Sequence, residues 1–255
     1  MSHRVVVTGC GCISPLGPTA SESWAAMREG RCGIGPITTI PTDILNVRVA
    51  AEVRDFDWTR HFESKRGALL DRFTQFALIA AREAFGQAGL LQADGRLPEA
   101  LGLDTAAIVG SGVGGLHTLD DSFRRLYGEG VPRVHPFTIP RLMVNAAASQ
   151  VSMEFGIMGP SYAVASACAS ANHAIGEAFR MVREGRARVA VTGGSEACIT
   201  VGTLKGWEAL RVMAVDTCRP FSAGRKGMVL GEGAAVFVLE RLEDARARGA
   251  PILAE

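Results

Sequence analysis

The chain has 255 residues, of which 47% are apolar and 21% are charged, so it can bury a large core and is not predicted to be disordered. Lysine and arginine number 27 against 26 acidic residues, and this balance argues against a nucleic-acid-binding surface as the main function. No run of about 18 apolar residues predicts a transmembrane helix. The six cysteines follow no regular spacing, which is typical of reduced thiols in a cytoplasmic protein.

Strand-like and helical segments alternate along the chain. Runs of β-branched residues predict strands at residues 4–8, 105–110, 162–166 and 188–192. Residues 228–239, interrupted by Gly231 and Gly233, predict a strand pair or a bent strand. The spacing of apolar residues predicts helices at residues 21–28, 71–88, 141–155, 169–184 and 242–248. The helix at 71–88 is expected to stop at Gly89, because glycine commonly ends helices. This alternation predicts a layered α/β fold with a largely parallel central sheet.

The last residues of the sequence resemble the beginning of another strand. After Pro251, the apolar residues 252–254 form a strand-like segment, and the chain stops at Glu255. A strand with no following helix to cover it predicts that the chain is incomplete.

The segment with the most chemical information is residues 163–173, AVASACASANH. A predicted strand ends here and a helix begins, with Cys168 at the junction among small residues that allow a sharp turn. Unpaired N–H groups at a helix N-terminus favour an anion, so a thiol there loses its proton more readily and can act as a nucleophile. The alternative is a small buried cysteine that packs as an apolar side chain. The residue types alone support the two interpretations about equally.

Five further segments occur with residues 163–173 in a recognisable order. They are residues 5–17 (VVVTGCGCISPLG), 110–115 (GSGVGG), 191–197 (VTGGSEA), 219–222 (RPFS) and 227–234 (GMVLGEGA). Together they resemble the β-ketoacyl-acyl-carrier-protein synthases, the condensing enzymes of fatty-acid and polyketide synthesis. The resemblance covers nearly the whole chain. Residues 166–173 and 218–227 look most like the nodulation-protein-E type, and Lys226 stands where most family members carry an acidic residue.

This resemblance implies a thiolase-like layered fold, α-β-α-β-α in the intact enzyme. Residues 1–255 would form its N-terminal β-ketoacyl synthase domain, with a mostly parallel mixed sheet, and the C-terminal half would be absent. It also implies that Cys168 takes an acyl group from the phosphopantetheine of an acyl carrier protein. A decarboxylating condensation with malonyl-acyl-carrier-protein would follow, in fatty-acid, polyketide or nodulation-factor acyl chain synthesis. The enzyme is expected to be a cytoplasmic homodimer with acyl carrier protein as its partner.

The family uses two histidines and a lysine from its C-terminal half, and none of the five histidines here falls in those motifs. The chain alone is therefore expected to be inactive. His173 follows Cys168 by five residues, about 140° around the helix, and is predicted to be structural. His117 and His135 are predicted to be solvated or locally hydrogen-bonded in loops or turns.

The resemblance assigns five residues to the acyl pocket. Gly112 and Val113 fall in the glycine loop that lines the acyl chain in the family, and Trp207 falls at an aromatic position near it. Phe137 and Thr138 belong to a segment that reaches across the family's dimer interface. The alternative is ordinary core packing for Val113 and Trp207, and a plain turn for Phe137 and Thr138.

Other ligand-binding patterns are weaker. The glycines at 110, 112 and 114 follow a strand, but their spacing is not that of a dinucleotide-binding loop, so no nicotinamide or flavin cofactor is expected. Cys10 and Cys12 have no second pair at zinc-site spacing, so no metal is expected.

Two rival functions remain open. One is a non-catalytic ketosynthase partner, like the chain-length factors, although such partners generally lack the nucleophile that Cys168 would provide. The other is a thiolase that acts on coenzyme A thioesters, which the signature at residues 219–234 disfavours.

Overall fold

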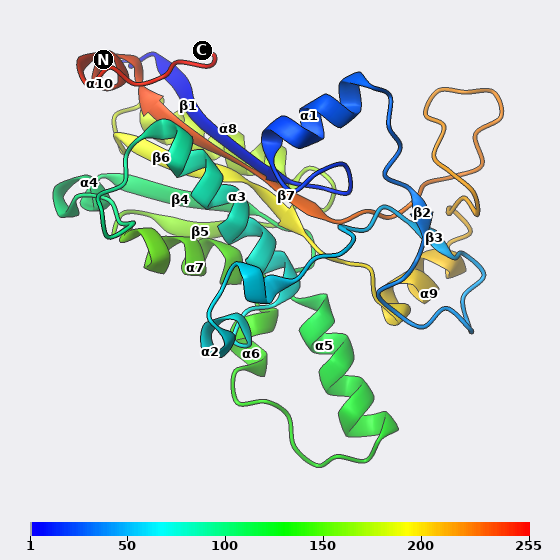
Figure 1. The fold of residues 1–255 in the computed structure, drawn as a ribbon. Helices are drawn as coiled ribbons and strands as arrows, with labels where there is room; N and C mark the ends of the chain where they lie inside the picture. The colour runs from blue at the N-terminus through cyan, green and yellow to red at the C-terminus, as the bar shows by residue number, and fades with distance from the viewer. Residues whose placement is uncertain (1) are drawn as a thin grey trace.

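The computed structural model describes residues 2–255, and a five-stranded β-sheet forms its centre (Figure 1). The strands are β1 (Val5–Ile13), β4 (Thr105–Gly110), β5 (Ser161–Val164), β6 (Val189–Glu196) and β7 (Gly233–Arg241), in the spatial order β1-β7-β6-β4-β5. β4 lies parallel to β5 and β6, whereas β7 lies antiparallel to β6 and β1. The sheet is therefore mixed, with three parallel strands at one side.

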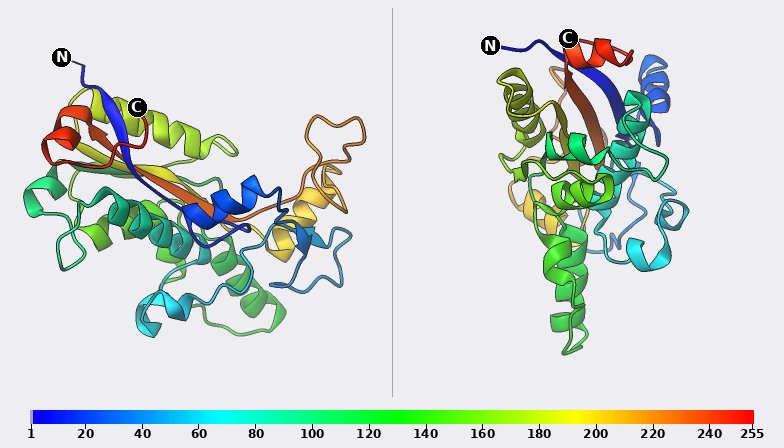
Figure 2. Two further views of the ribbon diagram at one scale, coloured as in Figure 1. Left: turned by 45° about the horizontal axis from the view of Figure 1, so that its top comes forward. Right: turned by 90° about the vertical axis from the view of Figure 1, so that its left-hand side faces the viewer.

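Helices cover both faces of this sheet, which forms the middle of three layers (Figure 2). α3 (Arg72–Ala88) and α7 (Ala146–Phe155) pack on one face, and α8 (Ser170–Arg183) packs on the other. The residues of β4 alternate between the two cores. Ala107 and Val109 pack with α3, and Ala106 and Ile108 pack with α8. A strand buried on both faces is apolar throughout, as residues 105–110 are.

The helix α3 confirms the prediction for residues 71–88. Asp71 precedes it, and its carboxylate accepts a hydrogen bond from the Phe73 N–H at 3.3 Å, which satisfies one free N–H group of the first turn. Gly89 follows it with φ = 65°, a left-handed conformation that costs glycine little.

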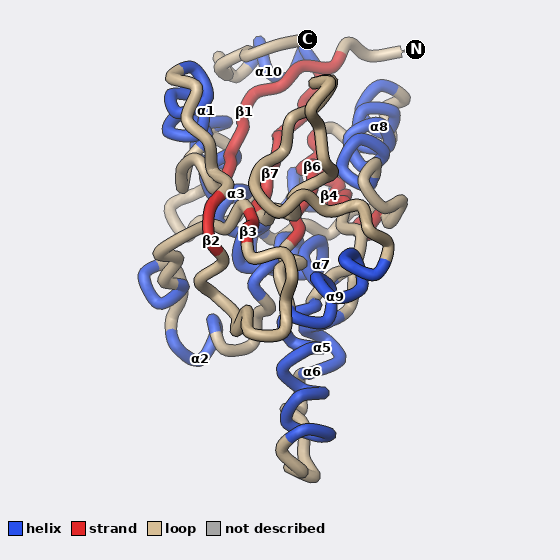
Figure 3. The backbone as a smooth tube through the Cα atoms, turned by 90° about the vertical axis from the view of Figure 1, so that its right-hand side faces the viewer, coloured by secondary structure: helices blue, strands red, loops and turns tan. Residues whose placement is uncertain are grey.

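The remaining elements are short. The helices are α1 (Ala20–Arg28), α2 (Ser64–Gly67), α4 (Glu99–Leu103), α5 (Leu116–Phe123), α6 (Thr138–Leu142), α9 (Val201–Ala209) and α10 (Leu242–Ala247), with a 3-10 turn at Trp58–Arg60 and a π-helical turn at Arg124–Gly128. Two short strands, β2 (Gly35–Pro36) and β3 (Val49–Ala50), pair with each other near α9, at one end of the main sheet (Figure 3). Residues 116–142, called the arm here, project from the body of the molecule (Figure 1).

Two strands extend beyond their predicted ends because glycines allow close packing. β1 was expected to end at residue 8, but it continues to Ile13. A Cβ atom at Gly9 would lie 2.0 Å from the carbonyl oxygen of Ala84 in α3. β6 similarly continues through Gly193, where a Cβ atom would lie 2.0 Å from the carbonyl oxygen of Ala235 in β7. These glycines therefore belong to strand interiors rather than to turns.

The prediction of one helix over residues 141–155 is wrong. The structure has two helices there, α6 and α7, because Met143 adopts an extended conformation with ψ = 137° and breaks the helical path. In the segment 228–239, only residues from Gly233 onward form a continuous strand, β7; before it, Met228 and Gly231 form isolated bridges with Met213 and Ala51.

The last residues pair with the edge of the sheet. The Val7 N–H donates to the Ala254 carbonyl oxygen at 2.9 Å, and the Leu253 N–H donates to the Val7 carbonyl oxygen at 2.9 Å. Residues 253 and 254 thus adopt the strand-like pairing that the sequence predicts. None of the helices within residues 2–255 combines the length and apolarity needed to span a bilayer.

Candidate active site

Cys168 lies at a sharp backbone bend between β5 and α8. β5 ends at Val164 and α8 begins at Ser170, so residues 165–169 make the turn. Ala167, directly before the cysteine, has φ = 51°, in the left-handed region that alanine seldom adopts. The bend brings Cys168 to the start of a 14-residue helix.

Hydrogen bonds centred on Ser170 hold one side of this bend. The Ser166 N–H donates to Ser170 Oγ at 2.9 Å, and the Ser170 hydroxyl donates to the Ala167 carbonyl oxygen at 2.7 Å. The Ser170 N–H donates to the same carbonyl oxygen at 3.1 Å. Because Ser170 is buried, water competes little for these bonds, and the first turn of α8 is fixed relative to the bend.

Cys168 is an exposed thiol, in contrast to Cys12 and Cys198, which are partly buried. Burial raises the pKa of Cys198 to about 12, and burial also raises the pKa of Cys12. Such thiols stay protonated and unreactive at neutral pH. Cys32 and Cys218 are exposed as well, but they lie in loops. Cys168 combines exposure with a position directly before the 14-residue helix α8.

Two glycines at strand ends let the first turn of α8 approach the sheet. At Gly110, the last residue of β4, a Cβ atom would lie 2.4 Å from the carbonyl carbon of Ser170. At Gly194, in β6, a Cβ atom would lie 2.6 Å from the Cβ of Ala171. A larger side chain at either position would push the helix away from the sheet and move Cys168 with it.

The glycine loop, residues 111–115, lies beside the bend. A Cβ atom at Gly112 would be 3.8 Å from the Cα and from the carbonyl oxygen of Ala167. Glu196, at the end of β6, is hydrogen-bonded to this loop. Its carboxylate accepts hydrogen bonds from the Gly112 N–H at 2.7 Å and from the Ser111 hydroxyl at 3.3 Å.

Burial raises the pKa of Glu196, while its hydrogen bonds to the loop act in the opposite direction. The local sequence pattern does not reveal this contact, which joins segments more than 80 residues apart. An acidic residue at the end of an otherwise apolar strand is the one signal that could have found it.

The structure brings two of the five predicted pocket residues to the bend. Gly112 lies next to Ala167, since a Cβ atom added at Gly112 would be 3.8 Å from the Ala167 Cα, and its neighbour Val113 is 47% exposed. Trp207 lies in α9 and is partly buried in a separate apolar cluster with residues such as Leu204. This packing agrees with the core alternative for Trp207.

Phe137 and Thr138 lie in the arm. Phe137 is 47% exposed, and Thr138 is buried at the start of α6, where its hydroxyl donates to the His135 carbonyl oxygen at 2.6 Å. The end of the arm joins the glycine loop, because the Gly115 N–H donates to the Leu142 carbonyl oxygen at 3.1 Å.

The nearest histidine along α8 contacts a serine rather than the cysteine. His173 Nδ1 lies 2.7 Å from Ser166 Oγ, which supports the structural role predicted for this residue. His135 is locally hydrogen-bonded as predicted, since its Nδ1 accepts from the Phe137 N–H at 3.1 Å.

The prediction for His117 is wrong. This residue lies in the helix α5 rather than in a loop, and its Nε2 atom is buried with no hydrogen-bond partner among the described residues. Burial lowers its pKa. Across residues 2–255, no three His, Cys, Asp or Glu side chains are grouped so that they could hold a metal ion.

Comparison with known proteins identifies the family. The family model "Beta-ketoacyl synthase, N-terminal domain" matches residues 2–245. The chain belongs to the β-ketoacyl synthase family. It is 47% identical over 255 residues to nodulation protein E of Rhizobium sp. (strain N33), covering 100% of this chain and 62% of that protein. It is 40% identical over 259 aligned residues to 3-oxoacyl-[acyl-carrier-protein] synthase 2 of Staphylococcus aureus (strain N315), covering 100% and 61%.

A solved β-ketoacyl synthase relative confirms the thiolase-like layered fold. The structure called "The ishigamide ketosynthase/chain length factor" superposes with a TM-score of 0.90 at 30% sequence identity, over 99% of this chain and 62% of that chain. The present chain thus spans about three-fifths of the length of these relatives. These matches confirm the predicted membership of the β-ketoacyl synthase family and the resemblance to nodulation protein E.

Proposed function

We propose that this chain provides the acyl-accepting half of a decarboxylating β-ketoacyl-acyl-carrier-protein synthase, with Cys168 as its nucleophile. The observation that carries the proposal is the exposed Cys168 thiol at the bend before α8. The family match and the name of one relative, 3-oxoacyl-[acyl-carrier-protein] synthase 2, support a role in acyl chain synthesis.

In the proposed first step, the Cys168 thiolate attacks the carbonyl carbon of an acyl thioester on the phosphopantetheine of an acyl carrier protein. The bond between that carbonyl carbon and the phosphopantetheine sulfur breaks, and the leaving thiolate takes a proton from solvent. The acyl group remains on Cys168. We expect the free N–H groups in the first turn of α8 to donate hydrogen bonds to the developing oxyanion.

In the proposed second step, a malonyl group on the carrier loses carbon dioxide, and the resulting carbanion attacks the acyl carbon. The carbon–sulfur bond to Cys168 breaks and the thiolate is regenerated. The histidines of this chain are poorly suited to assist, because His173 contacts Ser166 and His117 is buried in α5. The groups that assist this step therefore belong to a C-terminal half, and the chain alone is expected to lack full activity.

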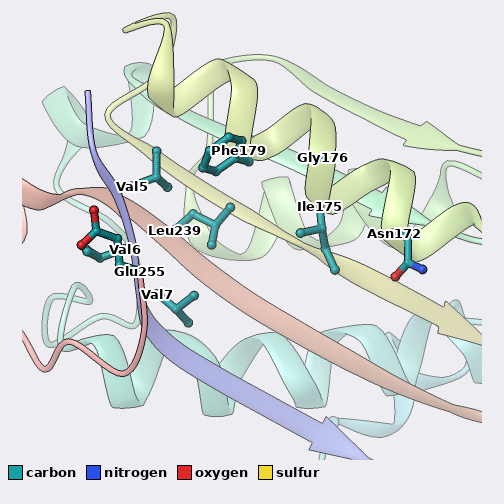
Figure 4. Close-up of a pocket in the computed structure, with 9 residues that line it drawn as sticks. All are labelled: Val5, Val6, Val7, Asn172, Ile175, Gly176, Phe179, Leu239 and Glu255. Carbon is teal, nitrogen blue, oxygen red and sulfur yellow. The ribbon is translucent and has the colours of Figure 1, made fainter. Parts of the chain in front are cut away.

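An apolar groove supports the proposal that a second half packs against this one (Figure 4). The groove, about 490 Å³ in volume, lies between α8 and the strands β1 and β7, and its lining includes Val5, Val7, Ile175, Phe179 and Leu239. Phe179 remains 39% exposed although it lies in α8, the helix that follows Cys168. An apolar patch of this kind marks a surface that another structural layer covers.

The arm supports the proposal of a homodimer. Its exposed apolar side chains are Phe123, Tyr127, Val134, Phe137 and Ile139. An extended segment with this surface is suited to burial against a second copy, where Phe137 and Thr138 would complete an acyl pocket lined by Gly112 and Val113. The free thiols of the six cysteines support a reducing, cytoplasmic location.

A non-catalytic partner subunit is the second candidate, since the solved relative includes a chain length factor in its name. The exposed Cys168 thiol favours a catalytic synthase over a non-catalytic partner subunit.

The test is transfer of an acyl group from an acyl-carrier-protein thioester, measured by intact mass. We expect one acyl adduct on the protein and none on the Cys168→Ala variant, whereas Cys32→Ala should be acylated as the unaltered protein is. An adduct that persists in Cys168→Ala, or no adduct on the unaltered protein, contradicts the proposed first step.

A further inference from the structure

The bend before Cys168 contains a conformation that the surrounding structure must hold in place. Ala167 has φ = 51°, and an alanine in this region is less stable than one with negative φ because its Cβ crowds the following carbonyl. Such residues persist only where neighbouring groups fix them. A change in φ at Ala167 would rotate the chain directly before Cys168 and move its sulfur away from the start of α8.

Ser170 restrains only the carbonyl side of Ala167, through the two hydrogen bonds that end on that oxygen. The glycine loop is the other neighbour of the bend: a Cβ atom added at Gly112 would lie 3.8 Å from the Ala167 Cα, so the two backbones run close together. Gly112 itself lies in a loop. Its position therefore depends on what holds the loop against the sheet.

Glu196 is the group that holds Gly112. Its carboxylate accepts the Gly112 N–H at 2.7 Å, and a Cβ atom at Gly112 would lie 2.9 Å from Oε2, so the contact is tight. Within residues 2–255, Glu196 forms no ion pair with an arginine, lysine or histidine. A partly buried carboxylate without a cation is costly, and its remaining partners are the loop groups that it orders.

We propose that Glu196 is a positioning residue for Cys168: it clamps the turn at Ser111 and Gly112 against Ala167 and so keeps the bend in its left-handed conformation. This inference rests on the proposed function only in taking Cys168 as the reactive residue. Glu196 would not contact the acyl group and would act entirely through the backbone.

The test couples Glu196 to the conformation of Ala167. Glycine adopts positive φ at little cost, so in an Ala167→Gly background the bend no longer needs the clamp. The measured quantity is the rate of Cys168 alkylation by iodoacetamide near pH 8, followed by peptide mass spectrometry, with Cys32 as an internal reference in the same sample. Glu196→Ala should slow Cys168 about fivefold, because the sulfur loses the helix N-terminus, and should leave Cys32 unchanged.

In the Ala167→Gly background, the same Glu196→Ala change should alter the Cys168 rate by less than about twofold. The matched control is Glu52→Gln: Glu52 is a buried carboxylate far from the bend in sequence that likewise accepts backbone N–H groups, from Thr38 and Thr39. It should leave the Cys168 rate unchanged, even if it lowers stability.

Equal slowing by Glu196→Ala in both backgrounds would show that Glu196 acts independently of the bend, and an unchanged Cys168 rate would show that it does not act on the cysteine. Either result overturns the proposal. If Glu196→Ala disrupts the packing around it, seen as faster alkylation of the partly buried Cys198, Glu196→Asp is used in its place, because a shorter side chain should not reach both Ser111 and Gly112. Since the readout is alkylation rather than acyl transfer, failure of the clamp is distinguishable from failure of the proposed function.

Discussion

Substitution of Gly110 by alanine is expected to displace the first turn of α8 from the end of β4. The added Cβ would lie 2.4 Å from the Ser170 carbonyl carbon and 2.5 Å from the Ala171 nitrogen, whereas ordinary contact begins at 3.4 Å. Helix and strand must therefore separate by about 1 Å. Overpacking typically costs about 1–3 kcal/mol, and backbone atoms cannot rotate away, so we expect a loss of about 3 kcal/mol in the free energy of unfolding.

Urea unfolding and thermal unfolding both measure this loss. For a chain of this size, about 3 kcal/mol corresponds to a decrease in Tm of roughly 6–12 °C. Under native conditions, alkylation of Cys168 should slow relative to alkylation of Cys32, because the cysteine moves with the helix. The matched control is Gly86→Ala in α3, where no atom lies within 4 Å of the new Cβ. That substitution should stabilise the protein by about 0.5–1 kcal/mol.

A Gly110→Ala protein with an unchanged unfolding midpoint and an unchanged Cys168 alkylation rate would refute the reasoning. It would mean that α8 does not rest on the end of β4 in solution. The position of the cysteine would then have a different structural origin.

Three further predictions concern charge and assembly. Burial lowers the pKa of His117 below its ordinary value of 6.5, so the unfolded chain binds this proton more readily, and stability should fall as pH decreases below about 6.5. His117→Gln should therefore reduce the loss of stability between about pH 7 and pH 5, measured by urea midpoints, and an unchanged pH dependence would contradict this. Arg72→Met leaves the carboxylate of Glu232, whose side chain is 1% exposed, without its ion-pair partner at 2.6 Å. We expect a loss of about 3–5 kcal/mol in urea unfolding, reduced when Glu232→Gln is added, and equal losses in the single and double variants would argue against a buried pair. In sedimentation experiments, Phe137→Asp in the arm should convert the proposed homodimer to monomer, whereas Ile44→Asp, at an exposed position outside the arm, should not. A protein that is monomeric before substitution would remove the basis of this last prediction.

Local sequence patterns determined several elements of this protein directly. Asp71 and Gly89 bound α3 because a capping carboxylate and a left-handed glycine act on neighbouring backbone groups. The strand at residues 105–110 was predictable because a continuous apolar run is what a strand buried on both faces requires. Cys168 stood out for a similarly local reason, since small residues on both sides of it mark a tight passage from strand to helix.

Tertiary structure alone decided how these pieces meet. Gly9 and Gly193 look like turn residues in the sequence, yet they lie inside strands because a carbonyl oxygen from another element occupies the space of a side chain. An acidic residue at the end of a strand marks Glu196 in the sequence, but it does not reveal that the carboxylate binds the N–H of Gly112, because that bond joins two segments brought together by the sheet. Capping and periodicity act over a few residues, whereas close approach between distant segments depends on the packing of the whole chain.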